Sequence, residues 1–191
     1  MKIEENKEYY RKQSVKKIQM LSAKQKSDSA KMLCDLFFQT IDVSQKKIKA
    51  VACYASDDSE LSVDSICEKL LSMGITVALP RIELNSMTFY SVKEINNLQR
   101  SSYGIRQPKK DTFNKVNEFD LMLIPGRVFD IFGNRIGRGA GYYDKFLEQN
   151  SCSNKVGIAF DFQVQKEALP IDVHDIVMNR VITEKAVYGT N

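Results

Sequence analysis

Apolar residues recur at helical spacing in two stretches of the N-terminal half of the chain. The first stretch follows Ser22 and Gln25, whose spacing fits a capping box, and it predicts a helix that ends near residue 38. The second stretch predicts a helix over residues 63–71 with Ser62 as its N-cap. The two apolar repeats are Ala30, Leu33, Cys34, Phe37 and Phe38, and Val63, Ile66, Cys67, Leu70 and Leu71.

Short apolar runs, typical of buried strands, alternate with these helical stretches. Residues 48–54 and 75–79 flank the second helix, and this strand–helix–strand unit predicts two parallel strands. Pro80 is expected to end the second of these strands. Further strands are predicted at residues 87–92, 121–124, 156–160 and 181–184.

This order of elements predicts an α/β fold in which helices cover both faces of a mostly parallel sheet, that is, a three-layer α/β/α architecture. The length of 191 residues favours a single domain over residues 1–191. In open sheets of this kind, ligands bind beyond the carboxyl ends of the strands. The polar loop at residues 55–60 is expected to lie there.

Composition narrows the classes of function. A hydrophobic content of 43% and a charged content of 27% are ordinary for a globular protein, and a net charge of +4 is weak evidence for nucleic-acid binding. We expect no signal peptide and no membrane span, because no apolar run is long enough. The four cysteines lack C-x-x-C spacing and there is one histidine, so we expect no zinc site and a reduced, cytoplasmic protein.

A glycine-rich loop is the first candidate for chemistry. Residues 137–141 contain three glycines and lie between the predicted strand at residues 121–124 and a helical pattern. Glycine lets backbone N–H groups approach an anion, and the start of a helix adds unpaired N–H groups and a positive dipole end. Arg135 and Arg138 add positive charge, and Asp144 lies where it could reach a phosphate-bound Mg²⁺. The loop therefore favours a phosphate site.

Each of these features also has a simpler explanation. A loop that turns for packing reasons needs glycine as well, and Asp144 would then only complement the helix dipole. The loop matches neither the Walker A pattern nor the dinucleotide fingerprint. The charge-rich residues 4–21 are typical of a solvated surface helix, and His174 is typical of an exposed loop residue.

The full string around the loop is more specific than its glycines. Residues 125–147 read Pro-Gly-x-x-Phe-Asp-x-x-Gly-x-Arg-Ile-Gly-Arg-Gly-x-Gly-Tyr-Tyr-Asp-x-Phe-Leu. This string closely resembles the signature of 5-formyltetrahydrofolate cyclo-ligases, also called methenyltetrahydrofolate synthetases. The resemblance implies a Rossmann-like architecture. It also implies an enzyme that converts 5-formyltetrahydrofolate and ATP into 5,10-methenyltetrahydrofolate, ADP and phosphate.

The resemblance implies a site for ATP. Family members carry Lys-x-x-x-Arg-Lys on an N-terminal helix, where the basic side chains reach the phosphates, and Lys7, Arg11 and Lys12 match this pattern. The glycine-rich loop would supply the remaining contacts. The residues implied to bind ATP are Lys7, Arg11, Lys12, Arg135, Gly137, Arg138, Gly139, Ala140, Gly141, Tyr142 and Tyr143.

The resemblance also implies a folate site. The family has Tyr-x-x-x-x-x-Glu after its first strand, and Tyr54 and Glu60 fit this spacing. A carboxylate at Glu60 could accept paired N–H donors from a pterin ring. The residues implied to contact the substrate are Tyr54, Ala55, Glu60, Arg138 and Tyr142, and of these Arg138 and Tyr142 are implied to act in catalysis.

Other positions concern the metal or depart from the family pattern. Asp144 and Asp175 are implied to anchor Mg²⁺. Ala140 stands where many members carry Gly or Lys, and Gln107 stands where the family carries Glu. These departures remove a cationic side chain and a carboxylate, respectively. Arg81, after a predicted strand, is either an active-site cation or a surface residue.

Two other classes of function stay open. A sugar-phosphate isomerase of the same architecture would need neither ATP nor the N-terminal basic residues, whereas a non-catalytic module would bind nucleotide and folate without forming product. Against these we expect phosphoryl transfer to the formyl oxygen, which gives an iminium phosphate that N10 of the folate closes into a ring. We expect a monomer that acts on a folate with one or more glutamyl residues and binds neither nucleic acid nor membrane.

Overall fold

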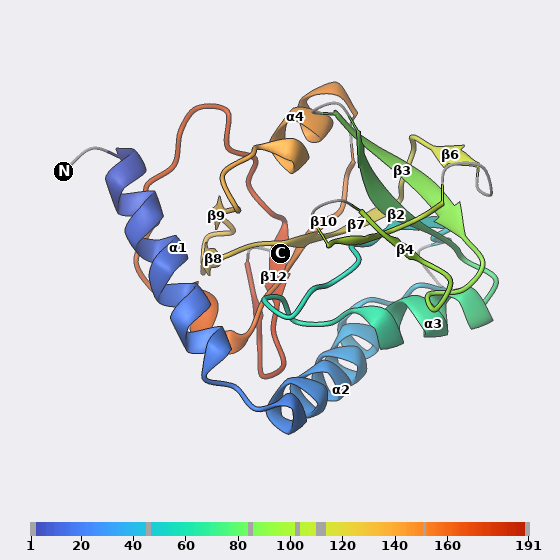
Figure 1. Cartoon of the computed structure of the whole chain (residues 1–191), viewed down its shortest axis with the longest axis horizontal. Coiled ribbons are helices and arrows are strands. Elements are labelled where there is room, and N and C mark those ends of the chain that lie inside the picture. The colour runs from blue at the N-terminus through green and yellow to red at the C-terminus, as the bar shows by residue number, and fades with distance from the viewer. Residues whose placement is uncertain are drawn as a thin grey trace.

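The computed structural model describes residues 3–44, 47–83, 86–101, 104–109, 114–150 and 152–189. Figure 1 shows the arrangement of its elements. The helices are α1 (Ile3–Gln19), α2 (Ala23–Thr40), α3 (Asp64–Ser72), α4 (Tyr142–Gln149) and the 3₁₀ turn η1 (Asp161–Gln163). The strands are β1 (Ala50–Ala52), β2 (Thr76–Glu83), β3 (Ser86–Val92), β4 (Gln99–Arg100), β5 (Arg106–Gln107), β6 (Lys115–Val116), β7 (Leu121–Pro125), β8 (Val128–Asp130), β9 (Arg135–Ile136), β10 (Lys155–Ile158), β11 (Val164–Gln165), β12 (Arg180–Ile182) and β13 (Val187–Tyr188).

One large sheet organises the fold. Within the described residues it has eight strands, in the order β13-β12-β10-β7-β1-β2-β3-β6. The central strand β1 pairs in parallel with β2 and β7, and β10 pairs in parallel with β7 and β12. The strands β3, β6 and β13 join at the two edges by antiparallel pairing. The predicted mostly parallel sheet is thus confirmed.

The sheet separates two apolar cores. Neighbouring residues of a strand point to opposite faces. Accordingly, Val51 belongs to the core that contains Phe37 of α2 and Leu70 of α3, whereas Ala52 belongs to the core that contains Phe146 of α4. Figure 1 shows α2 and α3 on one side of the sheet and α4 on the other. The predicted three-layer α/β/α architecture is therefore confirmed.

The strand β2 is longer than the sequence predicts. It does not end at Pro80 but runs on to Glu83, and Pro80 lies opposite Phe89 of β3. The neighbour on the other side, β1, ends opposite Ala78. Proline has no N–H to donate, so it is tolerated where one side of a strand has no partner. The prediction that Pro80 ends this strand was wrong, because the sequence does not show that β2 extends beyond the end of β1.

The connection from β7 to the glycine-rich loop is also less direct than expected. The short strands β8 and β9 form an antiparallel pair between them. Asp130, which is fully buried, accepts hydrogen bonds from the backbone N–H groups of Phe132 and Asn134 and closes the turn. The loop therefore leaves β9, and Arg135 at the start of β9 is held next to it.

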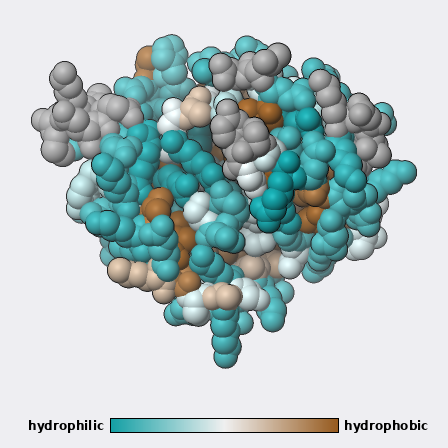
Figure 2. Space-filling model, viewed as in Figure 1, coloured by the Kyte–Doolittle hydropathy of each residue, from teal (hydrophilic) through white to brown (hydrophobic). Residues whose placement is uncertain are grey.

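The start of α2 agrees with the sequence pattern, and the start of α3 differs from it by one residue. Ser22 Oγ accepts a hydrogen bond from Gln25 N at 3.2 Å, and Gln25 Oε1 accepts one from Ser22 N at 2.8 Å, which confirms the capping box. The helix α3 begins at Asp64, so its N-cap is Val63 and not Ser62 as predicted, and Val63 forms no side-chain cap bond. Ser62 Oγ still accepts a hydrogen bond from Asp64 N at 3.2 Å, one residue before the cap. Among the described helices, none combines the length and apolar character needed to cross a membrane. The face seen in Figure 2 is mostly hydrophilic, with small separate apolar patches.

Candidate active site

A cavity of about 380 Å³ opens beyond the carboxyl ends of β1 and β7. The chain leaves β1 through α3 toward β2 on one side, whereas β7 lies on the other side and continues to β10. The order of strands thus reverses between β1 and β7, and this is where open α/β sheets bind their ligands. Tyr54 and Ala55 follow β1 into the cavity wall, and Pro125 and Gly126 end β7 there.

The glycine-rich loop forms one wall of this cavity. Gly139 and Gly141 have φ angles of 108° and 66°, which residues that carry a Cβ rarely adopt. Gly141 is the N-cap of α4, so the first N–H groups of α4 lie at the cavity. Arg11 of α1 lies against the loop and donates a hydrogen bond from Nε to the Gly137 carbonyl oxygen at 3.1 Å. The glycine-rich loop, the start of α4 and the cation of Arg11 therefore line the same space.

Lys7 joins α1 to the C-terminal segment at the edge of the cavity. Its Nζ lies 2.6 Å from Asp172 Oδ2 and 2.6 Å from Asp175 Oδ2. Burial lowers the pKa of Lys7, but its hydrogen bonds to the two carboxylates outweigh this effect and raise the pKa above its ordinary value. Burial raises the pKa of Asp175, but the Asp172 N–H, Lys7 and Arg135 outweigh it and lower the pKa. Both groups are therefore charged at neutral pH.

Arg135 and Asp144 form a second ion pair at the cavity wall. Arg135 Nη2 donates to Asp144 Oδ1 at 2.9 Å and to Oδ2 at 2.7 Å, and the two side chains are only 6% and 19% exposed. Arg135 Nη1 also donates to the Pro125 carbonyl oxygen at 3.3 Å, and its guanidinium lies 5.8 Å from the centre of the Tyr143 ring. Arg135 Nε is buried without a hydrogen-bond partner among the described residues. This pair fixes the start of α4 against β9.

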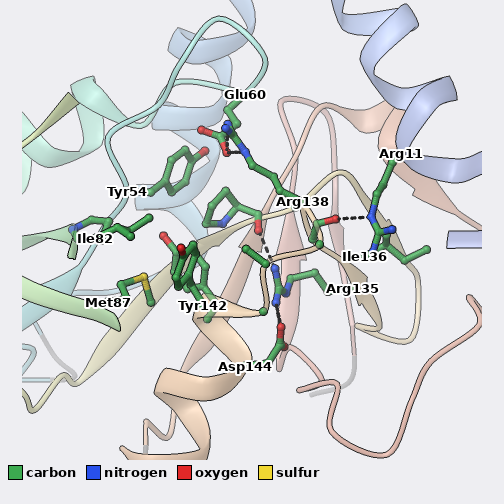
Figure 3. A pocket seen from close by; sticks show the side chains of 18 of the residues that line it. Arg11, Tyr54, Glu60, Ile82, Met87, Arg135, Ile136, Arg138, Tyr142 and Asp144 are labelled. Carbon is green, nitrogen blue, oxygen red and sulfur yellow. Dashed lines mark hydrogen bonds and ion pairs between the residues drawn. The ribbon is translucent and has the colours of Figure 1, made fainter. Parts of the chain in front are cut away.

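Arg138 reaches from the loop to the acidic segment after β1 (Figure 3). Its Nη2 lies 2.6 Å from Asp57 Oδ2 and 2.7 Å from Glu60 Oε1. Burial raises the pKa of Glu60 above its ordinary value, although the charge of Arg138 opposes the change. Burial also tends to raise the pKa of Asp57, but hydrogen bonds from Ser59 and Arg138 lower it. Of the two carboxylates, Glu60 is thus the one that protonates first as the pH falls.

The opposite part of the cavity is aromatic and apolar. Figure 3 shows Tyr54, Ile82, Met87 and Tyr142 on one side of the space, away from Arg11, Arg135 and Asp144. The Tyr54 hydroxyl donates to the Leu61 carbonyl oxygen, and burial raises its pKa well above the ordinary value, so the tyrosine stays neutral. Tyr54 therefore offers its ring to a ligand. The cavity has an aromatic half and a cationic half, with Arg138 between them.

The structure brings the predicted site residues together, with one exception. All of them line the cavity except Lys12, whose side chain is 69% exposed and pairs with Glu8 at 3.7 Å. The two residues of open role also lie outside the cavity. Arg81 donates to the Pro108 carbonyl oxygen and pairs with Glu83, and the His174 side chain is 80% exposed.

Several lining residues were missed by sequence analysis. Asp172 was passed over although it lies three residues before Asp175, and Asp57 was interpreted as a solvated loop residue. Both could have been identified from the sequence, because each is an acidic residue three positions before a predicted site residue. Ile82 and Met87 gave no signal, because they reach the cavity through the unforeseen length of β2 and its turn back into β3.

The carboxylates that line the cavity show whether the residues present fit the predicted Mg²⁺. No group of three or more His, Cys, Asp or Glu side chains that could hold a metal occurs in the described part of the chain. Asp144 and Asp175 both line the cavity, but each is paired with a cation, Arg135 and Lys7 respectively. The protein thus offers one or two carboxylates beside the glycine-rich loop, which is the number that Mg²⁺ takes when phosphates and water fill its other positions.

Comparison with known proteins points to one family. The model of the 5-formyltetrahydrofolate cyclo-ligase family matches residues 3–184. The 5-formyltetrahydrofolate cyclo-ligase of Haemophilus influenzae is 31% identical over 141 residues, which cover 70% of this chain and 75% of the relative. That of Escherichia coli strain K12 is 30% identical over 145 residues, which cover 72% and 79%.

Two solved structures share the fold. The NMR structure of 5,10-methenyltetrahydrofolate synthetase from Aquifex aeolicus superposes with a TM-score of 0.82 at 31% identity and covers 96% of this chain and 92% of its own. The 5,10-methenyltetrahydrofolate synthetase of Mycoplasma pneumoniae superposes with a TM-score of 0.75 at 25% identity and covers 94% of this chain and 99% of its own.

Proposed function

Because the chain belongs to the 5-formyltetrahydrofolate cyclo-ligase family, we propose that it converts 5-formyltetrahydrofolate and ATP into 5,10-methenyltetrahydrofolate, ADP and phosphate. The observation that carries the proposal is the division of one cavity into an aromatic half and a cationic half that share Arg138. A flat, uncharged pterin suits the first half and a triphosphate suits the second. The free cysteine thiols favour a reducing compartment, so we place the enzyme in the cytoplasm.

The cationic half would hold the triphosphate. Residues 137–141 and the start of α4 line the cavity, and their backbone N–H groups would donate to phosphate oxygens. Arg11, Lys7 and Arg135 surround this loop and would balance the charge of the phosphates. Lys12 points away from the cavity, and we assign it no contact with ATP.

The aromatic half would hold the pterin. The rings of Tyr54 and Tyr142 offer surfaces for stacking, and Ala55 leaves room for the ligand between them and β1. Glu60 is positioned to accept N–H donors of the pterin in place of its bond to Arg138. Its charged form is needed for this, so binding should weaken as Glu60 becomes protonated.

Mg²⁺ would enter the site with ATP. Asp144 and Asp175 are the side chains that would take part in holding it, directly or through its waters, because both lie beside the phosphate-binding loop. The metal would neutralise charge on the phosphates. Arg135 and Lys7 would then share their carboxylate partners with the ion.

The chemistry explains why both halves meet at Arg138. The formyl oxygen attacks the γ-phosphorus of ATP, the bond to the β-bridging oxygen breaks, and ADP leaves. N10 then attacks the activated formyl carbon and loses its proton, and phosphate departs with the former formyl oxygen as the ring closes. Arg138, with Tyr142 beside the formyl group, would stabilise negative charge during phosphoryl transfer, where positioning and charge account for most of the rate.

Absorbance in the methenyl-folate band tests the proposal, because the conjugated amidinium product absorbs to the red of the substrate. We expect the band to grow when ATP and Mg²⁺ are added to the protein and 5-formyltetrahydrofolate, and not when ATP is omitted. ADP should form in equal amount. Binding of both ligands without growth of the band would instead indicate a non-catalytic module.

A further inference from the structure

A second hollow, of about 500 Å³, adjoins the candidate active site. It lies between α4 and the edge of the sheet formed by β3 and β6, which lie on the same side of the molecule in Figure 1. We call this hollow the α4–β6 groove and define it by Lys115, Asn117, Lys145, Gln149, Met87 and Tyr142. Met87 and Tyr142 also line the active-site cavity, so the two spaces share a wall.

Among the described residues that line it, the groove carries positive charge and no negative charge. Lys115 of β6 and Lys145 of α4 face it from its two sides, and none of its described lining residues is acidic. Neither lysine forms an ion pair with a described residue. In the active-site cavity, by contrast, Lys7, Arg135 and Arg138 each pair with a carboxylate of the protein. The groove therefore suits a ligand that brings its own negative charge.

The shared wall indicates which ligand enters the groove. A pterin between Tyr54 and Tyr142 would point its substituent past Met87, because the opposite end of the cavity is taken by the phosphate-binding loop. The substituent of a folate is an aminobenzoyl group that ends in a glutamate, whose carboxylates are negative at neutral pH. Asn117 and Gln149 add amide groups that can bond to the peptide link of such a tail.

We propose that the α4–β6 groove binds the glutamyl carboxylates of the folate, with Lys115 and Lys145 as their counter-charges. This inference rests on the proposed function for the presence of a folate in the neighbouring cavity. The two lysines would set affinity and not the rate of ring closure, because neither lines the cavity that holds the reacting groups. Additional glutamyl residues would extend along the same groove.

The test compares two ligands that differ only in the glutamate, 5-formyltetrahydrofolate and 5-formyltetrahydropteroate. Their dissociation constants are measured by titration at low and high salt, for the wild type and for Lys115→Gln, Lys145→Gln and the double variant. Each single change should weaken binding of the folate about three- to fivefold, as expected for an exposed ion pair. Binding of the pteroate should not change, and the effect should shrink at high salt.

Lys31→Gln is the matched control, because it removes the same charge from α2 on the other face of the sheet. It should leave both dissociation constants unchanged. Equal binding of folate and pteroate by the wild type, or an equal loss for both ligands in the double variant, would overturn the proposal. Turnover is measured separately. A protein that prefers the folate through these lysines but forms no product would refute the proposed reaction and leave the groove assignment standing.

Discussion

Arg138 is the residue through which the glycine-rich loop contacts the acidic segment after β1. Its guanidinium pairs with both Asp57 and Glu60. Phosphates in the cationic half would compete with these carboxylates for the same guanidinium. A single side chain thus links the charge state of Glu60 to the occupancy of the loop.

Replacement of Arg138 should therefore change the pH profile as well as the rate. Arg138→Ala removes the charge that opposes the burial of Glu60, so the pKa of Glu60 should rise further. The role proposed for Glu60 requires its charged form. The acid limb of kcat/KM for the folate should therefore move to higher pH, and the plateau should fall by roughly 10²-fold or more. Arg138→Lys should shift the limb less. An unchanged acid limb in Arg138→Ala would show that Glu60 does not control it.

Asp144 should affect stability in addition to any contact with Mg²⁺. Asp144→Asn weakens a nearly buried ion pair with Arg135, and a hydrogen bond between charged groups contributes about 1.5–3 kcal/mol. Urea unfolding should show a loss of this size. Glu148→Gln, on the same helix and half exposed, should change the free energy of unfolding by less than about 0.5 kcal/mol. Full stability with lost activity would instead favour a role for Asp144 in metal binding alone.

For individual residues, the sequence predicts which side chains line the cavity better than it predicts which side chains they bond to. The resemblance to the family implied that Tyr54, Glu60 and Arg138 share one site, and all three line one cavity. It could not show that Arg138 bonds to Asp57, or that Lys7 bonds to Asp172. Those pairs join segments that are 81 and 165 residues apart. Such contacts depend on how the elements pack in three dimensions.

Among the elements, α1 shows how one helix can divide its basic residues between two roles. Lys7 and Arg11 lie on its inner face, at the cavity, whereas Lys12 follows Arg11 directly and points to solvent. The charge density of residues 4–21 predicted a solvated surface helix, and this prediction holds only for the outer face of α1. A periodicity of 3.6 residues places neighbours on different faces.

The matched pair Lys7→Gln and Lys12→Gln tests this division. Lys7→Gln leaves two carboxylates without their cation at the proposed ATP site, so the dissociation constant for ATP should rise about tenfold or more. Lys12→Gln should change it less than twofold. The pKa of Lys7 is raised and that of Asp175 lowered, so the pair is lost only at strongly alkaline or strongly acid pH. The difference between the variants should hold from about pH 5 to 9, and equal effects would exclude a specific role for Lys7.

The elements that the sequence did not predict are those whose bounds depend on how neighbouring segments pair with them. Apolar runs and caps were sufficient for α2, α3, β3 and β7. The extension of β2 past Pro80 depends on where β1 ends, and the pairing of β8 with β9 depends on the turn that Asp130 closes. Local patterns carry little information about either condition.

For the whole molecule, we expect a monomer. Strongly exposed large apolar side chains such as Val173, Met20 and Phe132 lie on different segments, and the face in Figure 2 shows no continuous apolar area. Sedimentation equilibrium should give the mass of one chain at micromolar concentration, with and without ATP. A mass of two chains would show that an interface exists on a face not recognised from these side chains.

The ion pairs of Lys7 also have a consequence for when activity begins. Lys7 and Asp175 lie 168 positions apart, so this wall of the cavity joins α1 to the segment between β11 and β12. A contact across so much chain forms slowly and only after the intervening sheet has assembled. On the ribosome, a nascent chain could fold β1 to β3 and still lack this wall. Binding of ATP should therefore start only once the segment that carries Asp172 and Asp175 has emerged, and translation itself would time the first turnover.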